Sequence, residues 1–295
     1  MNKINIFFDI KYIIDGFFSK KANRGGIFFV SWHVLQILQR NEKFQITLTY
    51  PFEYEGTRSL KKIKKHPYFS QFRFVCLALD QRIPQKIKIH RKNKKYVRMF
   101  YNYLRLAELK LKEKLYYDME YFMSAKIYLS PYYAIPKEII EQEHIKKFYI
   151  LHDTTPIIFP EYFGDSLDYN RILNSLNKSI YSFCVSQNTK NDFLKYCGDK
   201  LDSNKMFVTH IATNQDYVPN YNKEELLQVL KKYKVKHNPN NKYLFSLCSL
   251  EPRKNLPFTI TCFLKFIKKH NIQDLYFYLG GAVWLSFESD IYQKY

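Results

Sequence analysis

The sequence is poor in the residues that build a disulfide framework, a flexible linker or a membrane span. Its five cysteines are odd in number and widely spaced, without a Cys-x-x-Cys pair, so we expect reduced thiols and neither zinc nor a redox centre. Only 8 glycines and 11 prolines leave little room for a flexible linker. No run approaches the ~20 apolar residues that a bilayer span needs.

The first apolar stretch is interrupted by a carboxylate, which distinguishes it from the uncharged core of a signal peptide. Ile4, Ile6, Phe7 and Phe8 precede Asp9 and read as a buried strand. We therefore expect a cytoplasmic protein.

Acidic residues are scarce beside basic ones. The 27 Asp and Glu residues against 47 Lys and Arg give a formal net charge of +20, which would attract nucleic acid, an anionic membrane or a phosphorylated substrate. Charge alone does not choose among these partners, and a coding bias towards Lys, Asn, Ile, Tyr and Phe contributes to the excess.

What is abundant is a pattern of short apolar strands that alternate with helical stretches. This alternation predicts an α/β protein with a parallel sheet covered on both faces. A first domain is expected over residues 1–219, and residues 220–295 are expected to begin a second. The strands expected in the first domain are residues 4–9, 44–50, 72–79, 127–129, 148–151, 183–185 and 207–211.

Helices are expected between these strands. Apolar spacing predicts helices over residues 28–38 and 97–115. Ser186 is a suitable N-cap for a helix over residues 187–196, and Gly198 is placed to end it.

The second domain looks short. After a linking helix over residues 224–235, only two strands are expected, at 242–248 and 275–279. Two strands leave a parallel edge and an apolar face uncovered. We therefore expect either that the polypeptide is truncated or that something else, such as a partner chain, completes the sheet.

A strand-to-helix junction in this second part carries two cations. Arg253 and Lys254 follow the strand at 242–248 and precede apolar residues at helical spacing. The N-terminus of a helix favours an anion, and two full positive charges add to that preference, so the junction is a candidate diphosphate site. The alternative is a solvated basic helix start.

Two further motifs are candidates for ligand contact. Gly25 and Gly26 precede a helix, where backbone can approach a ligand closely, although the sequence matches neither Gly-x-Gly-x-x-Gly nor a phosphate loop. His152 and Asp153 directly follow a strand, where open α/β sheets place ligands. The alternative is a structural pair, in which Asp153 accepts from a backbone donor and His152 fills the wall.

The segment that begins at Gln81 and ends at Ala107 contains nine Lys or Arg and no Asp or Glu, interleaved with aromatic residues. This pattern suits an anionic membrane surface or, less well, RNA. The commoner alternative is a solvated helix face. A non-catalytic protein that binds RNA or anionic lipid through Lys92, Lys94 and Lys95 is the rival to an enzyme.

Several short motifs, in the same order and spacing, resemble retaining glycosyltransferases of family 4. They are Arg24-Gly25-Gly26-Ile27, Ile127 to Tyr133, Leu151-His152-Asp153-Thr154-Thr155-Pro156, Cys184 to Lys190, and Leu250-Glu251-Pro252-Arg253-Lys254-Asn255. The resemblance implies a GT-B-like architecture, with a complete N-terminal Rossmann-like domain and an incomplete second Rossmann-like domain. It implies no metal and no cofactor, because the nucleotide sugar is a substrate.

The resemblance also implies roles for single residues. Lys254, helped by Arg253, would neutralise the donor diphosphate, with Ser249 keeping the family's hydroxyl beside it. His152 and Asp153 would lie near the transferred sugar, and Gly25, Gly26 and Gly281 would line the cleft. The acceptor would be a saccharide or a lipid-linked saccharide, in cell-surface polysaccharide or lipopolysaccharide synthesis on the inner face of the membrane.

Two departures from the family stand out. Cys248 replaces the glycine that usually precedes the hydroxyl residue, and the family's later pair of glutamates would fall beyond Tyr295. We therefore expect weak or no transfer from the chain as it stands.

Overall fold

The computed structural model describes residues 3–18, 25–77, 122–163, 167–212, 221–232, 242–248 and 252–281. The chain divides into two compact units, Met1–Ile211 and Ala212–Tyr295. The expected helix over residues 97–115 and the basic segment from Gln81 to Ala107 lie outside the described residues.

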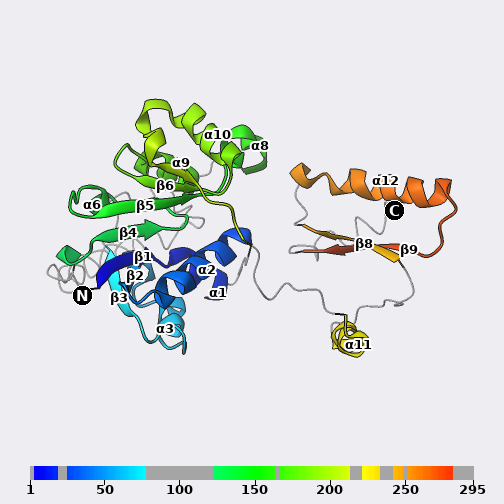
Figure 1. Ribbon diagram of the computed structural model, residues 1–295, viewed down its shortest axis with the longest axis horizontal. Coiled ribbons are helices and arrows are strands. Elements are labelled where there is room, and N and C mark those ends of the chain that lie inside the picture. The colour runs from blue at the N-terminus through cyan, green and yellow to red at the C-terminus, as the bar shows by residue number, and fades with distance from the viewer. Residues whose placement is uncertain are drawn as a thin grey trace, which may run out of the picture. The chain divides into compact units, whose positions relative to one another are not determined.

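The first unit is built on a sheet of seven strands in the order β3-β2-β1-β4-β5-β6-β7 (Figure 1). All six neighbouring pairs are parallel, which confirms the predicted α/β class and gives a Rossmann-like arrangement. The strands are β1 (Ile4–Asp9), β2 (Phe44–Pro51), β3 (Arg73–Leu77), β4 (Ile127–Ser130), β5 (Lys146–Leu151), β6 (Tyr181–Cys184) and β7 (Met206–Val208).

The seven strands occur where the apolar runs predicted them, and the clearest difference is at the sheet's edge. The last strand was expected to reach residue 211, but β7 ends at Val208, where its pairing with Cys184 ends. The amide of Thr209 still donates to the carbonyl of Cys184 at 2.8 Å, whereas Ile211 is 56% exposed. An edge strand has one partner only, so it stops where that partner stops.

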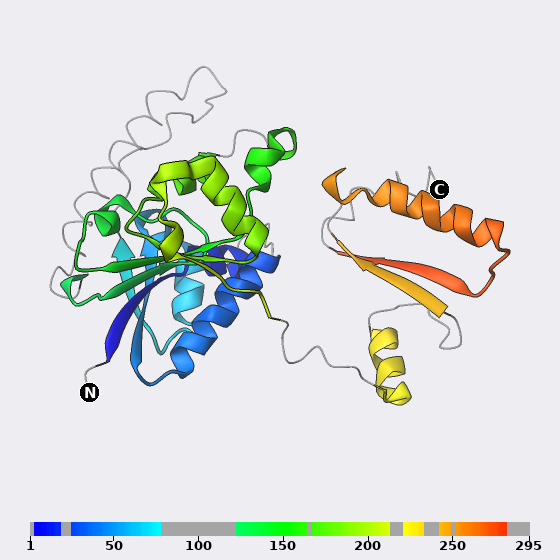
Figure 2. The same ribbon diagram turned by 45° about the horizontal axis from the view of Figure 1, so that its top comes forward.

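Helices cover both faces of the sheet, as Figure 2 shows. One apolar cluster joins Phe8 and Leu48 to side chains of α1, α2 and α3, and the other joins Phe7 and Tyr149 to side chains of α6, α9 and α10. Successive residues such as Phe7 and Phe8 therefore serve opposite faces, as the pleat requires. The helices are α1 (Lys11–Phe18), α2 (Gly26–Arg40), α3 (Arg58–Lys64), α6 (Lys137–Ile140), α7 (Thr155–Ile158), α8 (Pro160–Phe163), α9 (Leu167–Ser175) and α10 (Gln187–Cys197), with 3-10 turns η1 (Phe52–Tyr54), η2 (Gly198–Lys200) and η3 (Ser203–Lys205).

The predicted caps of α10 are confirmed. Ser186 Oγ accepts from the amide of Thr189 at 3.0 Å, and Gly198 follows the helix with a φ of 53°. A side-chain oxygen at the N-cap satisfies an amide that has no partner in the helix, and glycine adopts a positive φ without strain.

The described residues of the second unit form a two-stranded parallel sheet and two helices. β8 (Lys242–Leu247) pairs with β9 (Leu275–Gly280), and α12 (Leu256–Lys269) contributes the buried side chains of Leu256 and Ile260. The elements before α12 are α11 (Lys223–Lys232) and the 3-10 turn η4 (Pro252–Lys254). β8 is mostly exposed, with Phe245 at 60% and Leu247 at 74%, because β9 is its one neighbour among the described strands.

None of the described helices combines the length and the apolarity that crossing a bilayer requires.

The contact between α1 and α2 depends on the missing side chain of Gly16. A Cβ at Gly16 would overlap the ring of Phe28, whereas a Cβ at Gly26 would meet no atom within 4 Å. We expect Gly16→Ala to lower the free energy of unfolding by about 1–3 kcal/mol, because overpacking outweighs the gain of ~0.5–1 kcal/mol in helix propensity. Gly26→Ala should leave it unchanged or raise it slightly. Urea unfolding of both variants tests this, and equal stabilities would contradict the packing described.

Candidate functional site

The candidate site lies at the carboxyl edge of the first sheet, where β1 and β4 are neighbours. From β1 the chain continues to β2 and β3 on one side, and from β4 it continues to β5, β6 and β7 on the other. The connections that leave these two central strands therefore diverge, and open parallel sheets bind ligands at such a point. The residues that follow β1, β4 and β5 make up the site.

Asp9 ends β1 and is buried, with 6% of its surface exposed. Its Oδ1 accepts from the amide of Lys11 at 2.8 Å. Burial raises the pKa of Asp9 to about 6, with smaller contributions from the carboxylates of Asp15 and Glu53, while the amide and the charge of Lys11 oppose the rise. Asp9 is therefore a carboxyl group that titrates within one unit or so of neutral pH.

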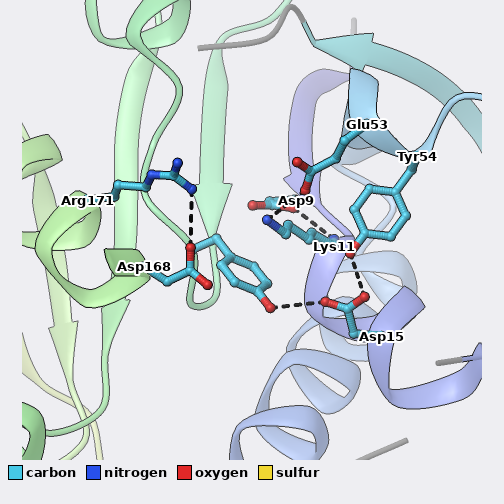
Figure 3. Close-up of polar contacts among 8 residues, drawn as sticks. Asp9, Lys11, Asp15, Glu53, Tyr54, Asp168 and Arg171 are labelled. Carbon is cyan, nitrogen blue, oxygen red and sulfur yellow. Dashed lines mark hydrogen bonds and ion pairs between the residues drawn. The ribbon is translucent and has the colours of Figure 1, made fainter. Parts of the chain in front are cut away.

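Asp15 joins two segments that are far apart in the sequence. The hydroxyl of Tyr54, from η1, donates to Oδ1 of Asp15, and the hydroxyl of Tyr133, after β4, donates to Oδ2 at 3.0 Å (Figure 3). Burial raises the pKa of both tyrosines, and the carboxylate beside them raises it further, so both remain protonated donors. The carboxylate thereby fixes the loops that follow β2 and β4 against α1.

Lys11 makes a second tie across the same edge. Its Nζ lies 2.9 Å from Oε1 of Glu53 and 4.1 Å from the centre of the Tyr133 ring (Figure 3). A cation over the face of an aromatic ring is stabilised by the ring's quadrupole. The ammonium is thus held between a carboxylate and a ring.

Aromatic rings form a continuous group between these charges and β5. The ring centres of Tyr12 and Tyr132 lie 4.9 Å apart, those of Tyr132 and Tyr133 lie 5.1 Å apart, and that of His152 lies 6.0 Å from Tyr132. All four side chains are half-buried. Their contacts bring the predicted residue His152 together with residues that follow β1 and β4.

His152 follows β5 and is held as a neutral imidazole. Its Nε2 lies 2.8 Å from the carbonyl oxygen of Pro131, and because a carbonyl only accepts, Nε2 carries the hydrogen. Burial lowers the pKa of His152, although this hydrogen bond and the charge of Asp153 oppose the change. At neutral pH the ring is therefore uncharged, with Nδ1 as an acceptor.

Asp153 is exposed and has a structural contact. Its Oδ1 accepts from the amide of Thr155 at 3.0 Å, and its carbonyl accepts from the hydroxyl of Tyr169 at 2.9 Å. The first of these contacts is the one that the structural interpretation of the His152–Asp153 pair anticipated. A catalytic part for Asp153 stays a prediction.

A second ion pair, on α9, lies beside the aromatic group. Arg171 lies 3.3 Å from Asp168, and the charge of Asp168 contributes to the raised pKa of both Tyr132 and Tyr133, after burial and nearer groups (Figure 3). Asp168 is therefore part of the electrostatic environment of the rings.

In the second unit the predicted strand-to-helix junction is confirmed. β8 ends at Leu247, and η4 places Arg253 and Lys254, both exposed, before the first turn of α12. Asn255, the N-cap residue, has a φ of 48° and no side-chain hydrogen bond to the helix. Ser249 lies outside the described residues, so its role stays a prediction.

The three glycines differ in what the backbone requires of them. Gly25 is the N-cap of α2 with an extended φ of −76°, and Gly26 begins the helix facing open space. Gly281 follows β9 with a φ of 152°, which favours glycine. Only Gly281 is therefore at a position where the backbone conformation itself favours glycine.

Sequence reasoning missed much of this site: Asp9, Lys11, Asp15, Glu53, Tyr54 and Tyr133. Asp9 carried a usable signal, since a carboxylate directly after three apolar residues ends a central strand. The contact between Asp15 and Tyr133 carried none, because it joins residues 118 positions apart. Among the residues that the structure describes, no group of three or more His, Cys, Asp or Glu is placed to hold a metal ion.

No protein-family model matches the chain, and no curated protein matches its sequence. Solved structures that are similar to it at low identity include the following two. The N-terminal domain of Candida albicans trehalose-6-phosphate phosphatase is 12% identical, with a TM-score of 0.42 over 84% of this chain and 57% of that one. Arabidopsis thaliana UGT89C1 complexed with quercetin is 13% identical, with a TM-score of 0.35 over 84% of this chain and 59% of that one. The chain thus spans less than two thirds of the length of either.

The buried carboxyl of Asp9 should make stability depend on pH. Its folded pKa of about 6 lies above the ordinary value of 3.8, so its contribution to stability is complete below pH 3.8 and is lost as pH rises through 6. Asp9→Asn lacks this titration. We expect the two proteins to be about equally stable near pH 4 and the variant to be more stable at pH 7, by up to about 3 kcal/mol. Urea unfolding across this range tests it, and a difference independent of pH would contradict it.

The two hydrogen bonds to Asp15 should be measurable one at a time. We expect Tyr54→Phe and Tyr133→Phe each to lower the free energy of unfolding by roughly 1.5 kcal/mol, because each removes a donor to a charged acceptor. Tyr196→Phe, at a ring that is 43% exposed, is the control and should change it little. The difference between the cost of the double variant and the sum of the two single costs measures how far the two hydrogen bonds depend on one another. A cost no larger than that of the control would show that Asp15 does not hold these loops.

Proposed function

We propose that this protein is a retaining glycosyltransferase of family 4 with a GT-B architecture. It transfers a sugar from a nucleotide-sugar donor to a saccharide or lipid-linked acceptor, in cell-surface polysaccharide or lipopolysaccharide synthesis. Residues 1–219 form the acceptor side, and residues 220–295 begin the donor side. The protein works in the cytoplasm, at the inner face of the membrane.

The observation that carries this proposal is the junction between β8 and α12. Arg253 and Lys254 are exposed in η4, directly before a helix of 14 residues whose N-cap makes no side-chain hydrogen bond to it. The N-terminal amides of a helix and two cations together suit a group with at least two negative charges. A nucleotide sugar presents such a group, its diphosphate, next to the bond that breaks.

The chemistry follows from the charge that develops when this bond loosens. The diphosphate leaves with additional negative charge, and Arg253 and Lys254 stabilise it without a metal ion. The sugar carbon that is left behind gains positive charge. Groups near that carbon must therefore be neutral or negative, whereas groups near the diphosphate must be positive.

His152 meets the first of these requirements. Its pKa is lowered by burial, so that the imidazole adds no positive charge to the sugar site at neutral pH. Its Nε2 is committed to the carbonyl of Pro131, which fixes the ring plane and leaves Nδ1 to accept from a sugar hydroxyl. We assign His152 the orientation of the donor sugar.

The remaining assignments rest on the family resemblance. Gly25 and Gly26 line the acceptor side, Gly281 lines the donor side, Asp153 lies beside His152, and Ser249 contacts the diphosphate. The basic segment from Gln81 to Ala107 contacts the anionic membrane surface. A basic protein that binds RNA or lipid without catalysis is the competing prediction.

Nucleotide binding tests the proposal without depending on turnover. A panel of nucleoside diphosphates is titrated into the full chain by calorimetry, and we expect at least one to bind. The double variant Arg253→Gln/Lys254→Gln should bind it roughly 10- to 100-fold more weakly, because two charge-assisted contacts are lost.

The matched control is Lys268→Gln/Lys269→Gln, which removes two charges from the last turn of the same helix. It should bind the nucleotide like the unmodified chain. If no nucleoside diphosphate binds, or if both double variants weaken binding equally, the proposed diphosphate site is wrong.

A further inference from the structure

Acidic side chains gather among the described residues at the carboxyl edge of the first sheet, although the whole chain carries a net charge of +20. Asp15 and Glu53 act electrostatically on Asp9, Asp15 and Asp168 act on Tyr133, and Asp153 and Asp168 act on Tyr132. Asp15, Asp153 and Asp168 therefore act on the aromatic group formed by Tyr12, Tyr132, Tyr133 and His152. Glu53 lies next to this group through Lys11, which contacts both Glu53 and the Tyr133 ring.

The two cations described near these carboxyl groups already have anionic partners. Lys11 lies 2.9 Å from Glu53, and Arg171 lies 3.3 Å from Asp168. A carboxylate or phosphate on a ligand would have to displace one of these partners before it gained a contact of its own. An anionic ligand would therefore gain few contacts with cations at this edge, and the carboxylates there would repel it.

The same aromatic rings and carboxylates suit the apolar face and the hydroxyl groups of an uncharged sugar ring. The C–H face of a pyranose is apolar and packs on half-buried rings such as those of Tyr12 and Tyr132, which lie 4.9 Å apart. Its hydroxyl groups donate to carboxylates, and such charge-assisted hydrogen bonds are stronger than neutral ones. Glu53 and Asp168, with 50% and 58% of their side chains exposed, are both open to this contact.

Two hydroxyl groups near Asp9 add a second observation. Thr49, the register partner of Asp9 on β2, and Tyr128 are both completely buried, and their hydroxyl groups interact with one another. Buried polar groups are normally paired in this way. The interior next to Asp9 is therefore polar as well.

From these contacts we infer that the acceptor sugar which enters this edge carries no negative charge: it is a neutral or amino-bearing pyranose, and uronic acids and sugar phosphates are excluded. This inference rests on the proposed function and narrows its acceptor class. Any membrane or lipid carrier contact must then be made elsewhere on the chain.

The test compares sugars that differ only in charge. Methyl pyranosides of gluco, galacto and manno configuration are used, each as the neutral sugar, the 2-amino sugar and the uronate. Binding to the full chain is measured by ligand-observed NMR in the absence of nucleotide. We expect at least one configuration whose neutral and amino forms bind, with the uronate at least tenfold weaker.

Glu53→Gln removes one negative charge and frees Lys11 from its ion pair. It should strengthen uronate binding roughly three- to tenfold relative to the neutral sugar. Glu141→Gln is the matched control, because Glu141 is also paired with a lysine, Lys137 at 3.4 Å, but precedes β5 at the opposite edge of the sheet. It should leave the ratio unchanged.

Three results would overturn the inference: a uronate that binds as tightly as its neutral counterpart, a binding ratio that Glu53→Gln does not change, or no binding by any of the pyranosides. None of these involves a nucleotide. Failure here is therefore distinct from failure of the diphosphate site, which the titration with nucleoside diphosphates detects.

Discussion

The carboxylate of Asp15 is the contact on which the organisation of the first unit's carboxyl edge depends. One oxygen accepts from Tyr54 and the other from Tyr133, so a single side chain on α1 holds the segments that follow β2 and β4. Three strands of the sheet are thereby connected outside their own hydrogen bonds. Without the Asp15 carboxylate, the Tyr133 ring would lose a hydrogen bond that holds it in place. Lys11 lies over the face of that ring, so its contact would also be affected.

The sheet was predictable from the sequence, whereas most of the site was not. Strands such as β1 and β5 are short apolar runs, and a run of this kind indicates a strand that is buried on both faces of the sheet. Ser186 and Gly198 are local signals that act on their own helix, and both were identified correctly. His152 was found for the same reason, since its position follows from the strand before it.

The groups around His152 escaped prediction because tertiary structure alone brings them together. The bond from Tyr133 to Asp15 spans 118 positions, and nothing in either local pattern refers to the other. Composition was misleading as well, because an excess of lysine and arginine suggests a surface that attracts anions. The fold nevertheless gathers acidic side chains such as Asp9, Asp15 and Asp168 among the described residues at the carboxyl edge of the sheet.

The position of β1 beside β4 also has a kinetic consequence. Phe8 pairs with Leu129, so closing this seam orders a loop of about 120 residues, whereas β1 to β3 and β4 to β7 are each assembled from nearer neighbours. We expect the two halves to form first and the seam between them last. The contacts of Asp15 straddle that seam, so a partly folded chain would possess the strands of this protein without the group of side chains at their carboxyl edge.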